Sequence, residues 1–168
     1  MFRKTLKRSV SILTLLAMML TLFPFAAFAE DTTASDLDGH WAEEVMQEWI
    51  GYGIIAGYED GTVRPDRSIT RAEMTALLDR VMDYQTTAAN HFTDLDDNWY
   101  TDVVLKANAA GMISGYPDGT VRPSATISRQ EAVAMFARVL SLDTANAPEA
   151  DFTDMDAVGD WATDAVNA

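Results

Sequence analysis

The sequence has no cysteine, and it has little positive charge after residue 29. Without cysteine, neither disulfides nor thiolate metal sites can form. The chain of 168 residues has 12 basic and 26 acidic side chains and a formal net charge of −14, and Lys106 is the only lysine after residue 29. An acidic protein repels phosphate backbones and anionic lipid headgroups, so the composition argues against nucleic acid and membrane surfaces as partners.

A long apolar run occurs only near the N-terminus. Basic residues at positions 3, 4, 7 and 8 precede the run Val10 to Leu22, and Ala27-Phe28-Ala29 is a small-x-small cleavage signal. This pattern predicts a signal peptide over residues 1–29, cleaved after Ala29, and the alternative is an uncleaved anchor. Cleavage removes four basic residues and no acidic one, which changes the net charge from −14 to −18. We therefore expect a secreted, strongly acidic protein with no membrane insertion after cleavage.

The remaining chain is duplicated. GYEDGTVRPDRSITRAE, from Gly57 to Glu73, returns as GYPDGTVRPSATISRQE, from Gly115 to Glu131, at an offset of 58 residues. At this offset 21 of 49 aligned positions are identical, a degree of similarity typical of repeated modules that pack on their neighbours. The predicted organisation is a linker at 30–35, repeat 1 at 36–84, a linker at 85–91, repeat 2 at 92–142, a linker at 143–151 and a partial repeat 3 at 152–168.

Each repeat begins with a predicted helix. Trp41, Val45 and Trp49 lie four residues apart, which is typical of one face of an amphipathic helix, and Gly53 is expected to end it. The copy runs from Trp99 to Gly111. Because Trp49 has no tryptophan counterpart in the copy, we interpret it as a core residue.

A rigid loop and a second helix are expected to follow. Asp60-Gly61 favours a tight turn, and Arg64 is expected to be extended because it precedes a proline. Thr70 to Glu73 has the pattern of a capping box, which Ser128 to Glu131 repeats. The residues expected to face inward are Met74, Leu77, Leu78, Val81 and Met82 in repeat 1, and Val133, Phe136, Ala137 and Leu140 in repeat 2.

FTDLDDNWY and AGMISGYPDGTVRPSATISRQEAVAMFARVL, with their first copy, resemble the S-layer homology domain family. The resemblance implies an all-α fold with three modules around a pseudo-threefold axis and ligand grooves between neighbours. It also implies a non-catalytic anchor at the cell wall or S-layer, with a secondary cell wall polysaccharide that carries pyruvate ketals, or a peptidoglycan-linked polymer, as its ligand. The third module is incomplete in this sequence.

The residues themselves indicate where an acid group could bind. Arg71 and Arg129 occupy the first helical position after each cap, where free amides and the helix dipole favour negative charge. An arginine can hold a carboxylate in a bidentate fork. The alternative is that each arginine pairs with a nearby acidic side chain.

Repeated aromatic residues are the other candidates for ligand contacts. Trp41, Trp99 and Trp161 could stack on the apolar face of a sugar, or they could belong to the core. Tyr58 and Tyr116 could donate hydroxyl hydrogen bonds, or stack on the turn, and the neighbouring glycines, Gly57 and Gly115, let a ligand approach the backbone. We interpret Arg64 and Arg122 as structural partners of Asp60 and Asp118.

Catalytic and metal sites are poorly supported. Asp94, Asp96 and Asn98 have the spacing of the start of an EF-hand loop, but Trp99 stands where that loop requires glycine. Acidic residues that recur with the repeat are explained as caps and turns rather than as a glycosidase pair. His40 and His91 do not recur, so the sequence predicts no catalytic residue, metal or cofactor.

The sequence thus predicts a module that anchors its parent protein to the cell wall through an anionic polysaccharide. The sequence leaves open which kind of parent protein carries this module. The alternatives are a lattice-forming S-layer protein, a surface polysaccharide hydrolase, and an outer-membrane protein tethered to peptidoglycan. The missing regions of an S-layer protein would supply self-assembly.

Overall fold

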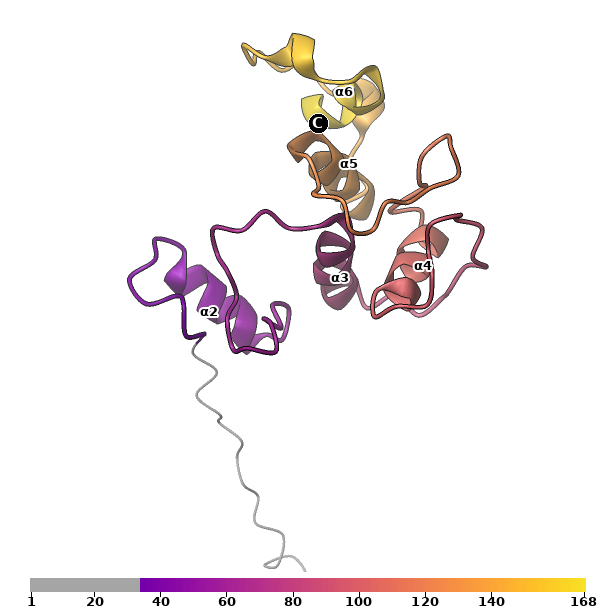
Figure 1. Ribbon diagram of the computed structural model, residues 1–168. Helices are drawn as coiled ribbons and strands as arrows, with labels where there is room; N and C mark the ends of the chain where they lie inside the picture. The colour runs from indigo at the N-terminus through magenta and orange to yellow at the C-terminus, as the bar shows by residue number, and fades with distance from the viewer. Residues whose placement is uncertain (1–33) are drawn as a thin grey trace, which may run out of the picture. The chain divides into compact units, whose positions relative to one another are not determined.

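The computed structural model describes residues 34–168 (Figure 1). The predicted signal peptide, 1–29, and residues 30–33 lie outside the described residues. The elements are α2 (Glu43–Gly51), α3 (Arg71–Met82), α4 (Thr101–Ala109), α5 (Arg129–Val139), η1 (Thr144–Asn146), η2 (Met155–Ala157) and α6 (Asp160–Asn167). Within residues 34–168 the only β pairing is an isolated bridge between Thr70 and Thr126, so the all-α prediction is confirmed.

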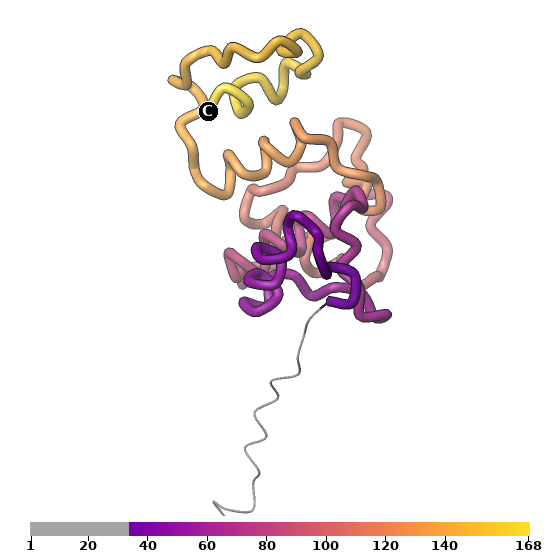
Figure 2. Tube along the Cα trace, turned by 90° about the vertical axis from the view of Figure 1, so that its left-hand side faces the viewer, coloured from indigo at the N-terminus to yellow at the C-terminus, as the bar shows by residue number. Residues whose placement is uncertain are grey.

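Each complete repeat is helix, loop, helix, and this alternation can be followed along the Cα trace in Figure 2. The first helices start two residues later than the tryptophans that were expected to open them. Gly53 and Gly111 follow those helices with φ of 72° and 73°, as predicted for a glycine that ends a helix.

The second helix of each repeat starts at the predicted capping box. In α3 the Glu73 amide donates to Thr70 Oγ1 at 3.2 Å, and the Thr70 amide donates to Glu73 Oε2 at 2.7 Å. The box at Ser128 has the same two bonds, at 3.4 and 2.8 Å. Two donors at each helix start are thereby satisfied, and both capping predictions are confirmed.

The loop between the helices differs from the prediction at one position. Arg64 was expected to be extended, but its φ is 52°, in the left-handed region, and Arg122 of repeat 2 has a φ of 50°. The carboxylate of Asp36 accepts hydrogen bonds from the amides of Val63 and Arg64, at 2.9 and 2.7 Å. This pair of hydrogen bonds holds the Arg64 backbone in the unusual conformation. The prediction of an extended arginine was therefore wrong.

The packing joins each repeat to the next, because α3 packs against α4 and α5 packs against α6 (Figure 1). The core cluster of buried residues lies mainly around α3, α4 and the loop of repeat 2, and it consists of Met74, Leu78, Phe92, Leu95, Val104, Ala107, Met112, Ile113, Val121 and Met135. A hydrophobic surface shared between repeats is expected of modules too small to bury a core alone.

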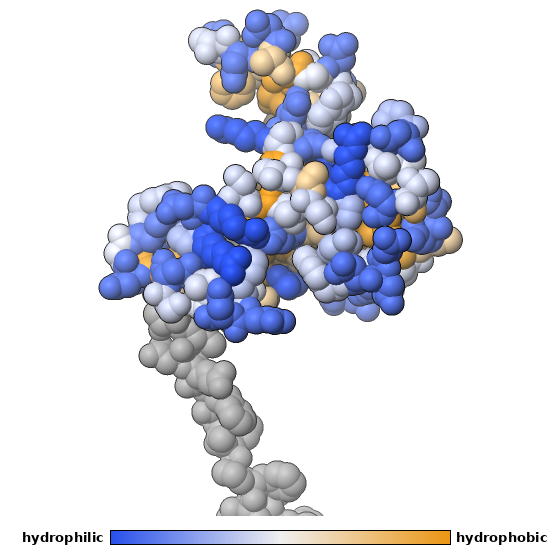
Figure 3. Space-filling model, viewed as in Figure 1, coloured by the Kyte–Doolittle hydropathy of each residue, from blue (hydrophilic) through white to orange (hydrophobic). Residues whose placement is uncertain are grey.

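The inward-facing predictions hold only in part. Met74, Leu78 and Ala137 are buried and Leu77 is half-buried, but the other five predicted residues are exposed: Val81, Met82, Val133, Phe136 and Leu140. The apolar stripe of each helix is wider than the surface that its neighbours cover. Figure 3 shows hydrophobic residues at the molecular surface where Figure 1 places α5 and α6.

The prediction that Trp49 is a core residue was also wrong, because its side chain is 41% exposed. Its counterpart Ala107 is fully buried in α4, which packs on the preceding helix α3. Among residues 34–168 no helix of an earlier repeat packs on α2, so the equivalent face of α2 stays exposed.

Candidate binding site at the junction of repeats 1 and 2

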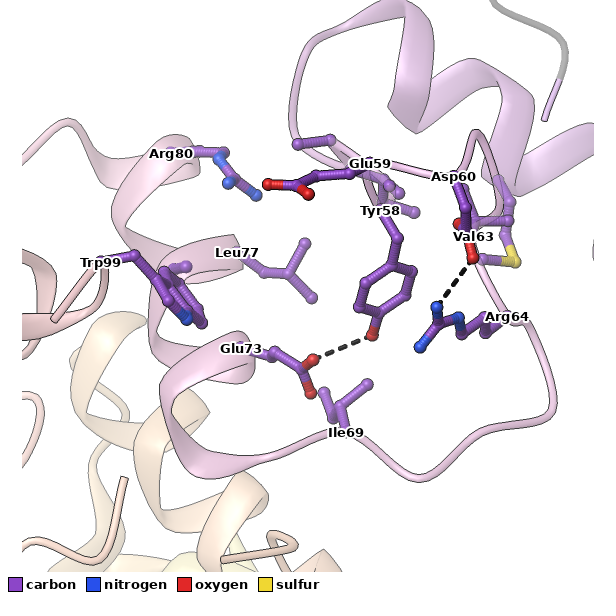
Figure 4. A pocket seen from close by; sticks show the side chains of 15 residues that line it. Tyr58, Glu59, Asp60, Val63, Arg64, Ile69, Glu73, Leu77, Arg80 and Trp99 are labelled. Carbon is purple, nitrogen blue, oxygen red and sulfur yellow. Dashed lines mark hydrogen bonds and ion pairs between the residues drawn. The ribbon is translucent and has the colours of Figure 1, made fainter. Parts of the chain in front are cut away.

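A pocket of about 660 Å³ lies between the loop of repeat 1 and α3, and Trp99 from repeat 2 contributes to its wall (Figure 4). This volume is in the range of small-molecule and sugar sites. The lining residues are Met46, Ile55, Ala56, Gly57, Tyr58, Glu59, Asp60, Val63, Arg64, Ile69, Glu73, Ala76, Leu77, Arg80 and Trp99. The pocket therefore brings together three of the predicted site residues, Gly57, Tyr58 and Trp99.

The turn beside the pocket is held by a charged pair. Asp60 accepts hydrogen bonds from the amide and hydroxyl of Thr62, at 3.1 and 2.6 Å, and from Arg64 Nη2 at 2.9 Å. The Thr62 hydroxyl and the Arg64 guanidinium lower the pKa of Asp60 to about 2. Asp118 and Arg122 form the same pair at 2.8 Å in repeat 2, so the interpretation of these arginines as structural partners is confirmed.

The glycines before the tyrosines are required by the backbone. Gly57 has a φ of 66°, and a Cβ on it would lie 2.9 Å from the Thr62 carbonyl oxygen. A Cβ on Gly115 would lie 2.6 Å from the Phe92 ring and 2.8 Å from the Thr120 carbonyl oxygen. Both contacts are shorter than packed atoms tolerate, so these positions need glycine whether or not a ligand binds.

Tyr58 is oriented by charged neighbours rather than left free. Its hydroxyl donates to Glu73 Oε1 at 2.9 Å, and its ring lies beneath the Arg64 guanidinium at 4.0 Å. Arg67 contacts the same hydroxyl and carboxylate. Burial and the hydrogen bond to Glu73 raise the pKa of Tyr58. The tyrosine thus supports the pocket wall with its hydroxyl already engaged.

In repeat 2 the corresponding arginine comes from repeat 1. Tyr116 donates to Glu131, and Arg71 Nη1 donates to Glu131 Oε1 at 3.0 Å. Arg71 Nε also donates to the Val121 carbonyl at 3.0 Å, and the Arg71 amide donates to Ala125 at 2.9 Å. The backbone amide and the guanidinium of Arg71, which were expected to hold a ligand, thus bond to residues of repeat 2. A direct role of Arg71 in ligand binding stays a prediction.

Sequence reasoning missed Arg67, although a difference between the two repeats at this position was an available signal. Position 67 is arginine in repeat 1 and its counterpart in repeat 2 is Ala125. The structure explains the difference, because Arg67 supplies in repeat 1 the guanidinium that Arg71 supplies to repeat 2.

Burial would raise the pKa of Glu131, but the Tyr116 hydroxyl and the Ser128 amide outweigh it, and the pKa lies below its usual value. The carboxylate is therefore ionised at neutral pH and can pair with Arg71.

The three repeated tryptophans are all exposed at their side chains. Trp41 is 89% exposed, Trp99 60% and Trp161 58%. Only Trp99 lines the pocket described above. The core interpretation of these residues was wrong, and a stacking role for them stays a prediction.

Arg80 is a second residue that sequence reasoning missed. Its Nη1 donates to the Ile54 carbonyl at 2.9 Å, and Figure 4 shows its guanidinium directed toward the Glu59 side chain at the pocket rim. Arg138 makes the equivalent bond to the Met112 carbonyl at 3.1 Å. The recurrence of this arginine at the repeat offset was the available signal.

Arg129 differs from Arg71. Its side chain is exposed, and among residues 34–168 it makes no hydrogen bond or ion pair. Its guanidinium is available to an acid group in solution, so a binding role for Arg129 stays a prediction.

Several acidic residues that recur in the two repeats have structural partners within the chain. Asp94, which was considered for calcium, accepts hydrogen bonds from the amides of Val121 and Arg122, both at 2.8 Å. Within residues 34–168 no three acidic or histidine side chains gather in a metal-binding arrangement. No helix of this part of the chain has the length and apolar character needed to cross a bilayer.

Comparisons with known proteins give one family. The model of the S-layer homology domain matches residues 35–75 and 91–133, which together make up half of the chain. One match falls on each complete repeat, and the matched segments contain both loops and both capping boxes.

Related proteins occur in several bacteria. A cellulosome-anchoring protein of Acetivibrio thermocellus is 35% identical over 137 residues, which are 77% of this chain and 30% of that protein. An amylopullulanase of Thermoanaerobacterium thermosulfurigenes is 32% identical over 149 residues, 84% of this chain and 8% of the enzyme. A surface layer protein of Brevibacillus choshinensis is 29% identical over 146 residues, 83% of this chain and 13% of that protein. The chain thus spans less than a third of each of these relatives.

Proposed function

Because the chain belongs to the S-layer homology domain family, we propose that it is a non-catalytic module that anchors its parent protein to the bacterial cell wall. Its ligand is an anionic secondary wall polysaccharide whose acid groups are pyruvate ketals or a similar carboxylate. The site of action is the cell surface, after removal of residues 1–29.

The observation that carries this proposal is the pocket between repeat 1 and Trp99. A half-exposed indole offers an apolar face to the C–H groups of a sugar ring. Arg80 and Glu59 at the rim can donate to and accept from sugar hydroxyls. Tyr58 and Gly57 shape the wall, so a sugar would enter a preformed site at the junction of two repeats.

A second site is proposed at the equivalent residues of repeat 2, where Gly115, Tyr116 and Trp161 repeat the pattern. Arg129 is proposed to hold an acid group because its guanidinium is exposed. Arg71 would do so only if a ligand carboxylate replaced Glu131. Trp41 is a further proposed contact on account of its exposure.

Two kinds of parent protein fit this anchoring role. The related surface layer protein favours a lattice protein, and the related amylopullulanase favours a polysaccharide hydrolase. The full-length secreted protein distinguishes them, since the first would form ordered arrays in electron micrographs and the second would release reducing sugars from a polysaccharide.

The anchoring proposal is tested by co-sedimentation of residues 30–168 with purified cell-wall sacculi, before and after chemical removal of the secondary polysaccharide. We expect binding to intact sacculi only, and a loss of about tenfold in affinity for Trp99→Ala, which removes the stacking surface. Trp49→Ala is the matched control, because Trp49 is partly exposed but does not line the pocket. Equal binding to stripped sacculi would refute the proposal.

A further inference from the structure

The two loops differ at one position in the nine-residue stretch that begins at Gly57. Glu59 of repeat 1 corresponds to Pro117 of repeat 2. Glu59 lines the pocket, and Figure 4 shows its carboxylate directed toward the Arg80 guanidinium, although the two form no ion pair. A carboxylate at this place partly neutralises the local positive charge that Arg80 offers to a ligand.

Arg138, the corresponding arginine of repeat 2, is held by the same kind of backbone hydrogen bond but has no counterpart of the Glu59 carboxylate beside it. Arg138 Nη1 donates to the Met112 carbonyl at 3.1 Å, as Arg80 Nη1 donates to the Ile54 carbonyl at 2.9 Å. In both cases one guanidinium nitrogen is held by the backbone, and the exposed remainder of the group can meet a ligand. Pro117 places no charge near Arg138.

Several features of the two surroundings are matched, although Phe92 packs on Gly115 where repeat 1 has Ala34. Each tyrosine donates its hydroxyl to the capping-box glutamate, and each loop carries the same aspartate–arginine pair. Trp161, the counterpart of Trp99, is exposed at the start of α6, which packs on α5. Asp160 stands before Trp161 where Asn98 stands before Trp99, and Asn98 does not line the pocket of repeat 1. Among the charged residues that line the pocket of repeat 1, only Glu59 has an uncharged counterpart in repeat 2.

We propose that Glu59 and Pro117 give the two sites different preferences for charge. The repeat 1 site takes a neutral sugar residue, whose hydroxyls bond to Glu59 and Arg80, and the repeat 2 site takes the acidic residue, whose carboxylate meets Arg138. A carboxylate beside an arginine repels a second anion and competes with it for the same donors. The inference rests on the proposed function. It predicts that the two repeats bind different sugar residues of one polymer.

The experiment isolates each site by removing the tryptophan of the other. Trp161→Ala leaves the repeat 1 site, and Trp99→Ala leaves the repeat 2 site. Each variant of residues 30–168 is titrated by calorimetry with two probes: wall polysaccharide that carries its pyruvate ketals, and the same polymer after mild acid has removed them. The affinity for the polymer with ketals, divided by the affinity for the polymer without them, measures the preference of the site for an acidic residue.

We expect the repeat 2 site to have the higher ratio. Adding Glu59→Gln to Trp161→Ala should raise the ratio about two- to fivefold, as expected for one partly exposed charge. Adding Pro117→Glu to Trp99→Ala should lower it by a similar factor, and Pro117→Gln is the control for the loss of proline. Far-ultraviolet circular dichroism checks that each variant is folded.

The possible failures are distinguishable. If intact residues 30–168 bind neither polymer, the proposed function fails and this inference fails with it. If the polymers bind but Glu59→Gln leaves the ratio unchanged, only the inference is overturned. A fall in the ratio on Glu59→Gln would likewise overturn it, because the carboxylate would then be favouring the acid.

Discussion

Arg71 Nη1 in repeat 1 donates to Glu131 Oε1 in repeat 2 at 3.0 Å, and only 11% and 15% of the two side chains are exposed. The same guanidinium donates to the Val121 carbonyl, and the Arg71 amide donates to Ala125. One residue of the first repeat therefore satisfies the capping-box glutamate, the loop and the backbone of the second. This contact therefore determines which face of repeat 1 packs against repeat 2.

The first prediction concerns that contact. Arg71→Ala should lower the free energy of unfolding by about 3 kcal/mol, because it leaves the Glu131 carboxylate partly buried without its cation. Denaturant unfolding of residues 30–168 measures the change. Arg129→Ala is the matched control, since Arg129 starts the equivalent helix but is exposed and has no partner among the described residues. Equal effects of the two substitutions would show that the inter-repeat pair does not stabilise the fold.

The second prediction concerns the glycine before Tyr116. Gly115→Ala should destabilise the protein by about 3 kcal/mol or more, since its Cβ would lie 2.6 Å from the Phe92 ring and 2.8 Å from a carbonyl oxygen. Gly119→Ala should cost only about 1 kcal/mol. Gly119 also has a positive φ, but the atom nearest to its added Cβ is a methyl carbon at 3.7 Å. Thermal melts of the two variants would contradict this account if their midpoints coincided.

The third prediction concerns acid pH. Hydrogen bonds from Thr62 and Thr120 and the adjacent guanidinium groups lower the pKa of Asp60 and Asp118 from 3.8 to about 2. Because the folded pKa lies below the unfolded one, this stabilisation is present above pH 3.8 and is lost as the pH falls toward 2. Protonation also relieves the repulsion among the excess acids, which acts in the opposite direction.

A comparison of variants separates these two effects. The double variant Asp60→Asn/Asp118→Asn lacks the paired carboxylates but keeps the other acids, so its unfolding free energy should fall less than that of the wild type between pH 4 and pH 2. Urea unfolding at pH 4, 3 and 2 provides the measurement. Parallel pH curves for the two proteins would rule out these carboxylates as the source of acid lability.

The fourth prediction concerns salt. The predicted mature charge of −18 repels an anionic polymer at long range, whereas an arginine and a bound carboxylate interact at contact distance. Raising ionic strength from about 0.01 M to 0.15 M shortens the Debye length from about 30 to 8 Å and screens the repulsion first. Affinity for the acidic polymer should therefore rise over this range, and affinity for the polymer without ketals should not. A steep fall with salt would contradict local binding by a single arginine.

Much of the local structure could be predicted from the sequence. The repeat, the capping boxes at Thr70 and Ser128, and the glycines that end the first helices follow from the preferences of neighbouring residues along the chain. The pairing of Arg64 with Asp60 belongs to the same class, because the two residues lie within one turn. The family could be recognised for the same reason, since its motifs are these short loop and cap patterns.

The packing between repeats was decided only by the tertiary structure. Periodicity identified the apolar faces but could not show which parts a neighbour covers, so Trp49, Val81 and Phe136 were expected inside and are exposed. Likewise, residues 71 and 131 meet because α3 and the loop of repeat 2 pack together, a contact that joins residues 60 positions apart. The sequence by itself determined the modules and their caps. Only the fold decided that Arg71 serves the next repeat, because a long-range contact depends on how the modules dock.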